Sequence, residues 1–284
     1  MSSLADVSMK LEILITPFHR LFTLDDLAIS FPHAEHERVP PGWLFGIAAG
    51  VPATVIAIWT LLSKMERHTV HVIYLGFFVS LLVTLLLTDI VKNAVGRPRP
   101  DLLARCKPES TAPAHGLVSF KVCTETAHHL LQDGFRSFPS GHSSFSFAGL
   151  GYLSLFFAGQ MKVYSAGTDP LRGLIAMLPL VGALLIAISR CEDYRHDVFD
   201  VCVGSALGFA ITYWSYRRYF PSLSGRDSHE PYPHRSIIAV KKRDDPTGAN
   251  GRFRQARARD SLDSNSDENE LRELVTDDLE VGRS

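Results

Sequence analysis

Apolar residues in this chain gather into long runs rather than recurring at a helical or alternating period. Five such runs cover residues 41–62, 71–91, 143–159, 171–188 and 201–216. A helix needs about 20 mostly apolar residues to cross a membrane. Helices buried in a soluble bundle usually show a polar stripe, and these runs show none. The pattern therefore predicts an all-α protein, a polytopic bundle of five transmembrane helices.

The sequence outside these runs is much more polar. Residues 1–40 hold only a short apolar stretch at 11–17, which is too short to span a membrane and does not resemble a signal peptide. From about Gly225 the chain is polar, with no periodic apolar pattern, which is typical of disorder. We therefore predict an N-terminal segment 1–40, a membrane domain 41–220 and a disordered cytosolic tail 221–284.

The charged residues that flank the runs predict an orientation. One set of run ends is basic and carries Lys64, Arg67, Lys162, Arg172, Arg217 and Arg218. Basic flanks favour the cytoplasmic side, so residues 92–142 and 189–200 should lie together on the lumenal or extracellular side. Cys106 and Cys123 share the first of these loops, so one disulfide is possible there if the loop faces an oxidising compartment.

Three polar clusters lie at run ends on this second side. They are Lys92 with Arg99-Pro100, then Pro139-Ser140-Gly141-His142, then Ser189-Arg190 with His196 and Asp200. Each cluster alone has an ordinary interpretation as a basic turn, a helix N-cap or a helix-surface pair. Together, in order and on one predicted side, they indicate a site that handles phosphate.

Cleavage of a phosphate ester needs positive charge around the nonbridging oxygens, a nucleophile in line with the leaving oxygen, and a proton for that oxygen. Lys92, Arg99 and Arg190 are cations suited to hold phosphate oxygens. Ser140 and the Gly141 amide could donate further hydrogen bonds, since glycine lets the backbone approach closely.

Two histidines are candidates for the covalent and acid–base steps. His142 and His196 both carry imidazole, which changes protonation near neutral pH. Asp200 follows His196 by four residues, which at a helix start would place both on one face and let the carboxylate orient the ring. Other carboxylates nearby should be solvated or ion-paired rather than metal ligands, so no metal and no cofactor is expected: Asp101, Glu192, Asp193 and Asp197.

The three clusters resemble the signature of the type 2 phosphatidic acid phosphatase superfamily, K-x-x-x-x-x-x-R-P, P-S-G-H and S-R-x-x-x-x-x-H-x-x-x-D, and match it at every position. Residues 23–27, 29–32 and 35–40 also resemble fungal and plant lipid phosphate phosphatases, and most of all the fungal diacylglycerol pyrophosphate phosphatases. The resemblance covers residues 17 to about 220. That family has six spans, so we expect its first helix to be missing before residue 41.

The resemblance implies a role for each residue of the clusters. His196 would be the nucleophile that forms a phosphohistidine, Asp200 would orient it, and His142 would protonate the leaving alkoxide. The phosphate would be held by Lys92, Arg99, Ser140, Gly141 and Arg190. Arg97 and Ser189 are additional candidates.

The predicted function is a Mg²⁺-independent membrane phosphatase acting on diacylglycerol pyrophosphate, phosphatidate and lysophosphatidate. The motifs read phosphate and not the lipid tail, so a phosphatase for polyprenyl pyrophosphate or a sphingoid-base phosphate stays open, as does a noncatalytic protein that binds lipid phosphates. Membrane lipids are the expected surroundings, in the vacuolar, endoplasmic reticulum or plasma membrane. The net charge of −1 gives no reason to expect nucleic acid.

Overall fold

The computed structural model describes residues 16–113, 115–165, 167–225 and 227–233. In this part of the chain the regular elements are helices: η1 (Leu27–Ile29), α2 (Pro41–Phe45), the π-helical η2 (Gly46–Gly50), α3 (Val51–Leu62), α4 (Arg67–Val95), α5 (Leu102–Cys106), η3 (Phe120–Val122), α6 (His128–Asp133), α7 (Gly141–Gln160), α8 (Pro170–Glu192) and α9 (Val198–Tyr219). The prediction of disorder for the tail falls mainly on residues 234–284, outside the described residues.

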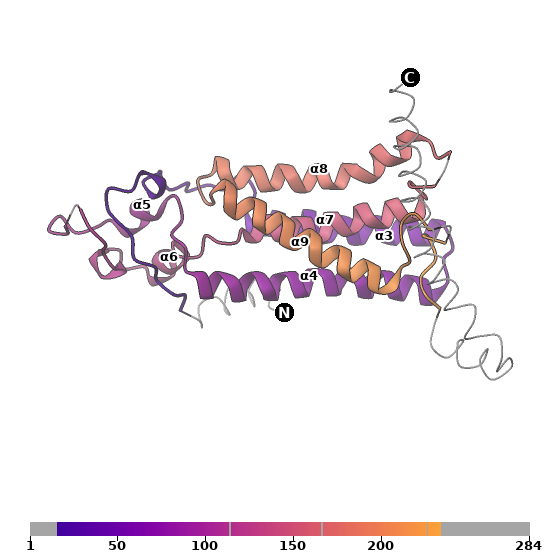
Figure 1. Cartoon of the computed structure of the whole chain (residues 1–284), viewed down its shortest axis with the longest axis horizontal. Coiled ribbons are helices and arrows are strands. Elements are labelled where there is room, and N and C mark those ends of the chain that lie inside the picture. The colour runs from indigo at the N-terminus through magenta and orange to yellow at the C-terminus, as the bar shows by residue number, and fades with distance from the viewer. Residues whose placement is uncertain (1–15, 114, 166, 226, 234–284) are drawn as a thin grey trace, which may run out of the picture.

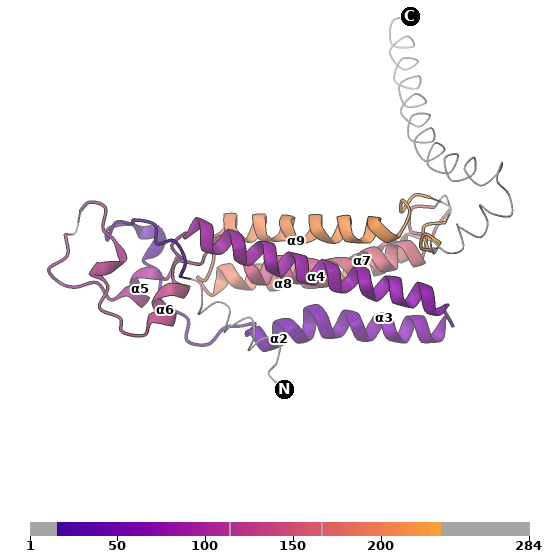
Figure 2. The same ribbon diagram turned by 90° about the horizontal axis from the view of Figure 1, so that it is seen from below.

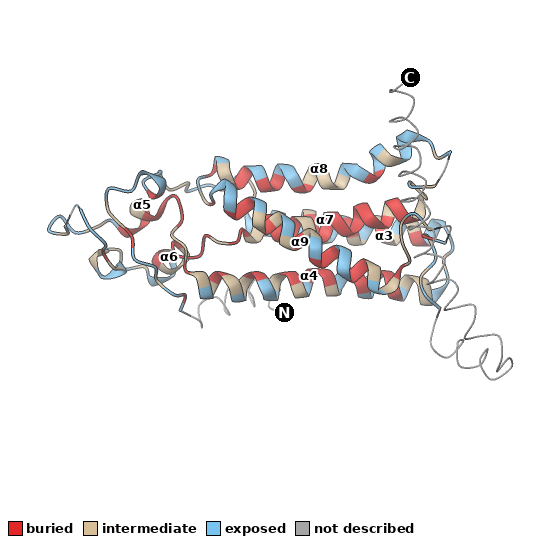
Figure 3. Cartoon of the chain, viewed as in Figure 1, coloured by how far each residue is buried: buried red, intermediate tan, exposed pale blue. Residues whose placement is uncertain are grey.

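Long helices lie side by side along the molecule (Figures 1 and 2). Among the described residues, four stretches are long and apolar enough to cross a membrane: Pro41–Leu62, α4, α8 and α9. The fifth predicted span, α7, has 20 residues, a length of about 30 Å. It is not one of the four because its Ser and Gly residues lower its mean hydropathy. Most of its residues are buried by the surrounding helices (Figure 3). The predicted all-α polytopic bundle is confirmed, with α7 at its centre.

Small residues allow the central helix to approach its neighbours. A Cβ atom at Gly204 of α9 would lie 2.6 Å from the carbonyl oxygen of Ser140, and one at Gly208 would overlap the backbone of Ser144. The two glycines are four residues apart, as in the small-residue interfaces of membrane helices. The contact places the first turn of α7 against the second and third turns of α9, at the end of the bundle that carries the second and third clusters.

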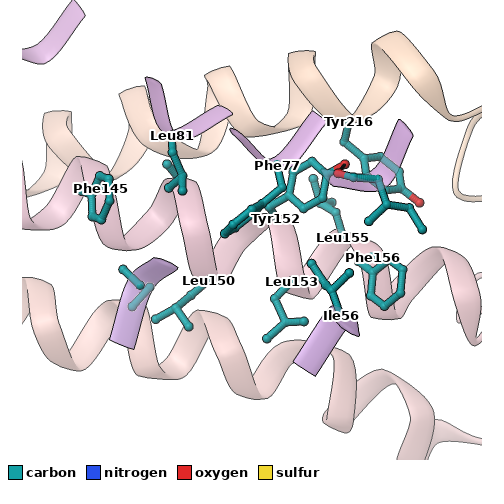
Figure 4. Packing of buried hydrophobic residues seen from close by; sticks show 14 of the residues in the cluster. Ile56, Phe77, Leu81, Phe145, Leu150, Tyr152, Leu153, Leu155, Phe156 and Tyr216 are labelled. Carbon is teal, nitrogen blue, oxygen red and sulfur yellow. Dashed lines mark hydrogen bonds between the residues drawn. The ribbon is translucent and has the colours of Figure 1, made fainter. Parts of the chain in front are cut away.

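Apolar and neutral polar contacts hold the bundle together. Phe77, Tyr152 and Tyr216 belong to its buried apolar cluster (Figure 4). Hydroxyl groups join the helices: Tyr152 donates to the carbonyl of Ile73 at 2.9 Å, and Thr212 donates to the carbonyl of Ala148 at 3.0 Å. Such bonds satisfy polar groups where no water is available.

A cap covers one end of the bundle; we use this name for residues 16–40 and 97–140 without 114 (Figure 1). Its small apolar core includes Phe22, Leu102 and Phe135. Cys106 and Cys123 form a disulfide, the bridge that the sequence left open. Gly96 joins α4 to the cap with φ +58°, and a side chain there would collide with the carbonyl of Phe18.

The basic flanks lie at the opposite end of the bundle from the cap. The links α3–α4 and α7–α8 and the end of α9 meet there (Figures 1 and 2). The predicted separation of basic flanks from polar clusters is therefore present in the fold.

Candidate active site

The three polar clusters meet where the cap joins the bundle. α4 ends there and brings Lys92, α7 begins there with Gly141 and His142, and α8 ends there with Arg190. Because these helix ends share one level, residues far apart in sequence become neighbours. A Cβ atom at Gly141 would lie 3.1 Å from the Nζ atom of Lys92, and the Ser140 amide donates to the Asp200 carbonyl at 3.0 Å.

His196 lies at the centre of this site. It is 3% exposed, and its Nδ1 atom has no hydrogen-bond partner among the described residues. The helix α9 begins at Val198, so His196 precedes the N-cap Asp197 and is not in the helix, contrary to the predicted helical pair. Burial and the positive charges of Arg99 and Lys92 hold the pKa of His196 well below its usual range. The imidazole is therefore neutral at neutral pH, as a nucleophile must be.

Asp200 is fully buried and ties several segments together. One carboxylate oxygen accepts from Arg97 Nη1 at 2.6 Å, and the other accepts from Ser137 Oγ at 2.5 Å and from the Asp197 amide at 3.2 Å. The Oδ2 atom lies 3.9 Å from His196 Nδ1, beyond hydrogen-bond distance. Asp200 is therefore next to the histidine, and a movement of about 1 Å would bring the two side chains within hydrogen-bond distance. Active-site hydrogen bonds are often long in the absence of substrate.

Arg97, one of the two additional candidates, is already engaged by carboxylates. It pairs with Asp200 and, through Nη2, with Asp197 at 2.9 Å. Its guanidinium also lies 5.8 Å from the ring centroid of Phe199. In this arrangement Arg97 therefore holds the carboxylates of Asp200 and Asp197.

The start of α7 presents backbone amides to the site. The Ser140 side chain caps the helix by accepting from the Ser143 amide at 3.4 Å, and Ser143 Oγ donates to it at 2.9 Å. The amides of Gly141 and His142 belong to the first turn, where a helix supplies no intrahelical acceptor. Amides and dipole together make such a helix start favourable for an anion.

His142 is held by the backbone of the cap. Its Nε2 atom lies 3.0 Å from the carbonyl oxygen of Val39 and 3.9 Å from Glu37 Oε2. A carbonyl oxygen only accepts, so Nε2 carries a proton in this arrangement. The other ring nitrogen, Nδ1, is then the one that can exchange a proton with a ligand.

Arg190 is buried, with 1% of its surface exposed, and is already bound on three sides. Its Nη1 atom donates to Glu37 at 2.8 Å, Nη2 donates to Asp193 at 2.6 Å, and Nε donates to Ser189 Oγ at 3.4 Å. A guanidinium has five N–H donors, so two remain for a phosphate. Ser189, the second additional candidate, thus contacts the arginine.

Arg99 is bound towards the cap. Its Nη2 atom donates to Asp133 Oδ1 at 2.6 Å, and its Nε atom donates to the Asp133 carbonyl at 2.8 Å. Burial raises the pKa of Asp133, but the guanidinium groups of Arg99 and Arg105 outweigh it and hold the pKa below its usual range. Asp133 is therefore ionised and fixes Arg99, whose positive charge reaches His196.

Lys92 differs from these arginines. It is 9% exposed, and no carboxylate in the described part of the chain reaches its ammonium group within ion-pair distance. Asp89, one turn earlier on α4, does not make that contact either. A buried charge without a partner is unfavourable, so the position beside Lys92, Gly141 and His196 is suited to an anionic ligand.

A cavity of about 620 Å³ adjoins the site and includes His196 and Arg97 in its wall. Much of the remaining wall is apolar: Leu21, Phe22, Ile29, Phe31, Tyr194 and Val198. Leu21, Tyr194 and Val198 are exposed at the surface. The wall of the cavity therefore mixes polar groups such as His196, Arg97 and Asp197 with apolar groups, some of them buried and some exposed at the surface.

Sequence reasoning missed several members of this charged network. The motifs did not predict Glu37, Arg195 or Asp133 as site residues, and Arg105 was expected only as part of the basic charge of its loop. The partners of Glu37 and Asp133 lie far away in sequence, 158 residues in the pair of Glu37 with Arg195 and 34 in the pair of Asp133 with Arg99, so no local spacing signals them. Each of the nearby carboxylates forms an ion pair: Asp101 with Arg105, Glu192 and Asp193 with Arg38, and Asp197 with Arg97.

Comparison with known proteins identifies relatives of this arrangement. The family model described as the PAP2 superfamily matches residues 73–223. "Probable diacylglycerol pyrophosphate phosphatase 1" of Schizosaccharomyces pombe is 44% identical over 215 residues, 75% of this chain and 76% of that protein. Diacylglycerol pyrophosphate phosphatase 1 of Saccharomyces cerevisiae is 42% identical over 78% of this chain and 76% of its own. Lipid phosphate phosphatase 2 of Arabidopsis thaliana is 34% identical over 83% and 81%. No solved structure matches.

Proposed function

This chain belongs to the PAP2 superfamily and is an integral membrane lipid phosphate phosphatase, and we propose that it hydrolyses diacylglycerol pyrophosphate, phosphatidate and lysophosphatidate through a phosphohistidine on His196, without Mg²⁺. The names of the two fungal relatives support diacylglycerol pyrophosphate as a substrate. The observation that carries the mechanism is the largely buried Lys92, which has no carboxylate within ion-pair distance among the described residues, beside a neutral His196 and the start of α7.

The phosphate group would lie among the cations and amides of the site. Lys92 would hold one nonbridging oxygen, and the two remaining N–H groups of Arg190 would hold others, with Arg99 adding charge. The amides of Gly141 and His142 would donate to the same oxygens. Ser140 would act indirectly, by capping α7. These cations would neutralise the phosphate charge, a role that a metal ion fills in other phosphatases.

The reaction would proceed in two displacements. A ring nitrogen of His196 attacks phosphorus, the bond to the leaving oxygen breaks, and a P–N bond forms. Protonated His142 gives its proton to the leaving oxygen. Neutral His142 then takes a proton from water, which attacks phosphorus, releases phosphate and restores His196. Asp200 would close the 3.9 Å separation and stabilise the charged imidazole of the intermediate.

The lipid would reach the site through the cavity beside His196. Its outer wall includes the exposed side chains of Leu21 and Val198, and Val198 begins a membrane-spanning helix. We infer that the region of the lipid nearest the phosphate occupies this apolar part while the acyl chains stay in the membrane.

The site would face the lumen or the extracellular space, with the tail in the cytosol. The disulfide in the cap supports this side, because disulfides persist in oxidising compartments. The basic flanks at the other end support a cytosolic location for that end. The membrane would be that of the vacuole, the endoplasmic reticulum or the cell surface.

Phosphate release by the purified protein tests this proposal. Diacylglycerol pyrophosphate and phosphatidate are supplied in excess EDTA to wild type, His196→Ala and the matched control His115→Ala, an exposed histidine of the cap. Wild type and control should release phosphate from both lipids, and His196→Ala should not. A strict Mg²⁺ requirement, or activity that survives in His196→Ala, would refute the mechanism. Selective turnover of polyprenyl pyrophosphate or sphingoid-base phosphate would refute the substrate assignment.

A further inference from the structure

Glu37 connects the cap to the catalytic groups. It lies in the cap segment just before α2, and its side chain is 19% exposed. Its Oε2 atom accepts from Arg190 Nη1 at 2.8 Å, and its Oε1 atom accepts from Arg195 Nη2 at 2.5 Å. The Oε2 atom also lies 3.9 Å from His142 Nε2. One carboxylate thus contacts a phosphate-holding arginine and adjoins the histidine assigned as proton donor.

The surroundings of His142 give this carboxylate a specific role. The other charged and titratable groups near the imidazole are Lys92 from α4, Arg190 from α8 and His196 from the loop before α9. The first two are cations, which oppose a proton on the ring. Among the described carboxylates Glu37 is the one within ion-pair distance of that ring. It is therefore the group that can stabilise protonated His142.

We propose that Glu37 is a positioning residue that fixes Arg190 and keeps His142 able to donate a proton to the leaving group. The Val39 carbonyl and the Glu37 carboxylate lie on the Nε2 side of the ring, which leaves Nδ1 to give its proton. This role rests on the proposed function. At 3.9 Å Glu37 acts on His142 through its charge, and the hydrogen bond to the Val39 carbonyl holds the orientation of the ring.

A comparison of the two lipids as substrates distinguishes the effect of Glu37 on proton donation by His142 from its effect on the position of Arg190. Phosphatidate hydrolysis expels diacylglycerol, whose alkoxide is strongly basic and needs a proton. Diacylglycerol pyrophosphate hydrolysis expels phosphatidate, whose phosphate oxygen leaves as an anion without one. Fixing of Arg190 serves both reactions equally. Loss of the Glu37 charge should therefore slow phosphatidate hydrolysis much more than diacylglycerol pyrophosphate hydrolysis.

The test compares Glu37→Gln, which keeps the shape and removes the charge, with Glu37→Asp and with Glu35→Gln, an exposed glutamate two residues away. The kcat/KM values for both lipids are measured across pH with purified full-length protein. The kcat/KM value reports only the steps up to the departure of the leaving group. Hydrolysis of the phosphoenzyme, which is common to both lipids, therefore does not affect it.

Glu37→Gln should lower kcat/KM at least about tenfold more for phosphatidate than for diacylglycerol pyrophosphate, since proton donation is typically worth a hundredfold or more. The alkaline limb of its phosphatidate profile should move to lower pH. Glu37→Asp should give an intermediate ratio, which also tests the role if Glu37→Gln does not fold, and Glu35→Gln should match wild type.

Equal losses on both lipids with an unchanged pH profile would overturn the role in proton donation and leave only a brace for Arg190. Wild-type activity in Glu37→Gln would overturn both parts. The two hypotheses stay distinguishable, because wild type itself reports on the proposed function. A wild type that releases no phosphate from either lipid would refute that function and the role of Glu37 with it.

Discussion

The interior of the bundle and its boundary with the cap are built from different interactions. Between the helices, neutral hydroxyls such as Ser80 and Thr212 bond to each other at 2.7 Å, and glycines allow close backbone contact. At the boundary, buried arginines alternate with carboxylates, as where Arg190 contacts Glu37 and Asp193. Charges are costly inside a membrane, so they gather where water and phosphate can reach them.

This difference separates stability from activity. Variants between the helices should change the stability of the fold, and variants at the boundary should change turnover. Lys92 is the informative exception, because its charge lies at the boundary without a carboxylate partner in the described residues. The charge of Lys92 lowers the stability of the fold, and its presence at the site indicates that it serves function.

The largest effect is expected at the contact of α7 with α9. Gly208→Val would push a side chain into the backbone of Ser144, so the loss of stability should exceed the roughly 1–3 kcal/mol of ordinary overpacking. The variant should give little folded protein in detergent. Gly42→Ala is the matched control, since a Cβ there meets nothing within 4 Å. Equal thermal unfolding temperatures for the two variants would contradict the close contact.

Lys92→Met sharpens the comparison, because activity and stability should change in opposite directions. Loss of the phosphate-holding charge should reduce kcat/KM by ~10²-fold or more. Removal of a buried unpaired charge should leave the unfolding temperature unchanged or raise it. Phosphate release and thermal unfolding in detergent check the two parts. A variant that is destabilised and retains activity would show that Lys92 serves the fold.

Removal of the disulfide should destabilise the cap. Cys106 and Cys123 are separated by 17 residues, and a loop of this size is worth about 3 kcal/mol when closed. Cys123→Ser should therefore destabilise the cap and lower activity several-fold, with the bundle still folded. Cys202→Ser, at an exposed cysteine of α9, is the control. Partial proteolysis locates the loosened region; unchanged cap protection in Cys123→Ser would contradict this.

The smallest effect concerns pH. The pKa of His196 is held well below 6.5 in the folded protein, whereas the unfolded chain takes up a proton near the ordinary value. Unfolding therefore binds protons, and this group lowers stability as pH falls through about 6.5. The acid limb of the kcat/KM profile should lie below that pH. In Lys92→Met this limb should move to higher pH, because one of the charges that lower the pKa of His196 is removed. An acid limb above pH 6.5 in wild type would contradict a neutral buried His196.

Much of the bundle could be predicted from sequence. Runs of apolar residues located every long helix, including α7, predicted at 143–159 and observed at Gly141–Gln160. The ends were less accurate: α4 was expected at 71–91 and extends over Arg67–Val95. Its last turn carries Lys92 and Asn93, polar residues that hydropathy excludes from a span although they remain helical. A prediction from apolar residues therefore ends a helix too early where its last turn carries polar residues of the site.

The candidate site was predictable as a set of residues but not as a network. Motif spacing located the three clusters, which the fold then brought together. The short separation of His196 from Asp200 suggested a helical pair, yet the capping box of α9 starts the helix after His196. Glu37 could not be placed from spacing, because its contacts with Arg190 and Arg195 depend on the path of the cap over the bundle.

Trapping the intermediate tests the central claim most directly. The protein is mixed in EDTA with diacylglycerol pyrophosphate labelled in its terminal phosphate and quenched in alkali, in which phosphohistidine survives. Wild type should carry labelled phosphate that acid releases, at His196 by peptide mapping, and His196→Ala should carry none. Turnover by wild type without labelled protein, or label retained by His196→Ala, would contradict covalent catalysis at this histidine.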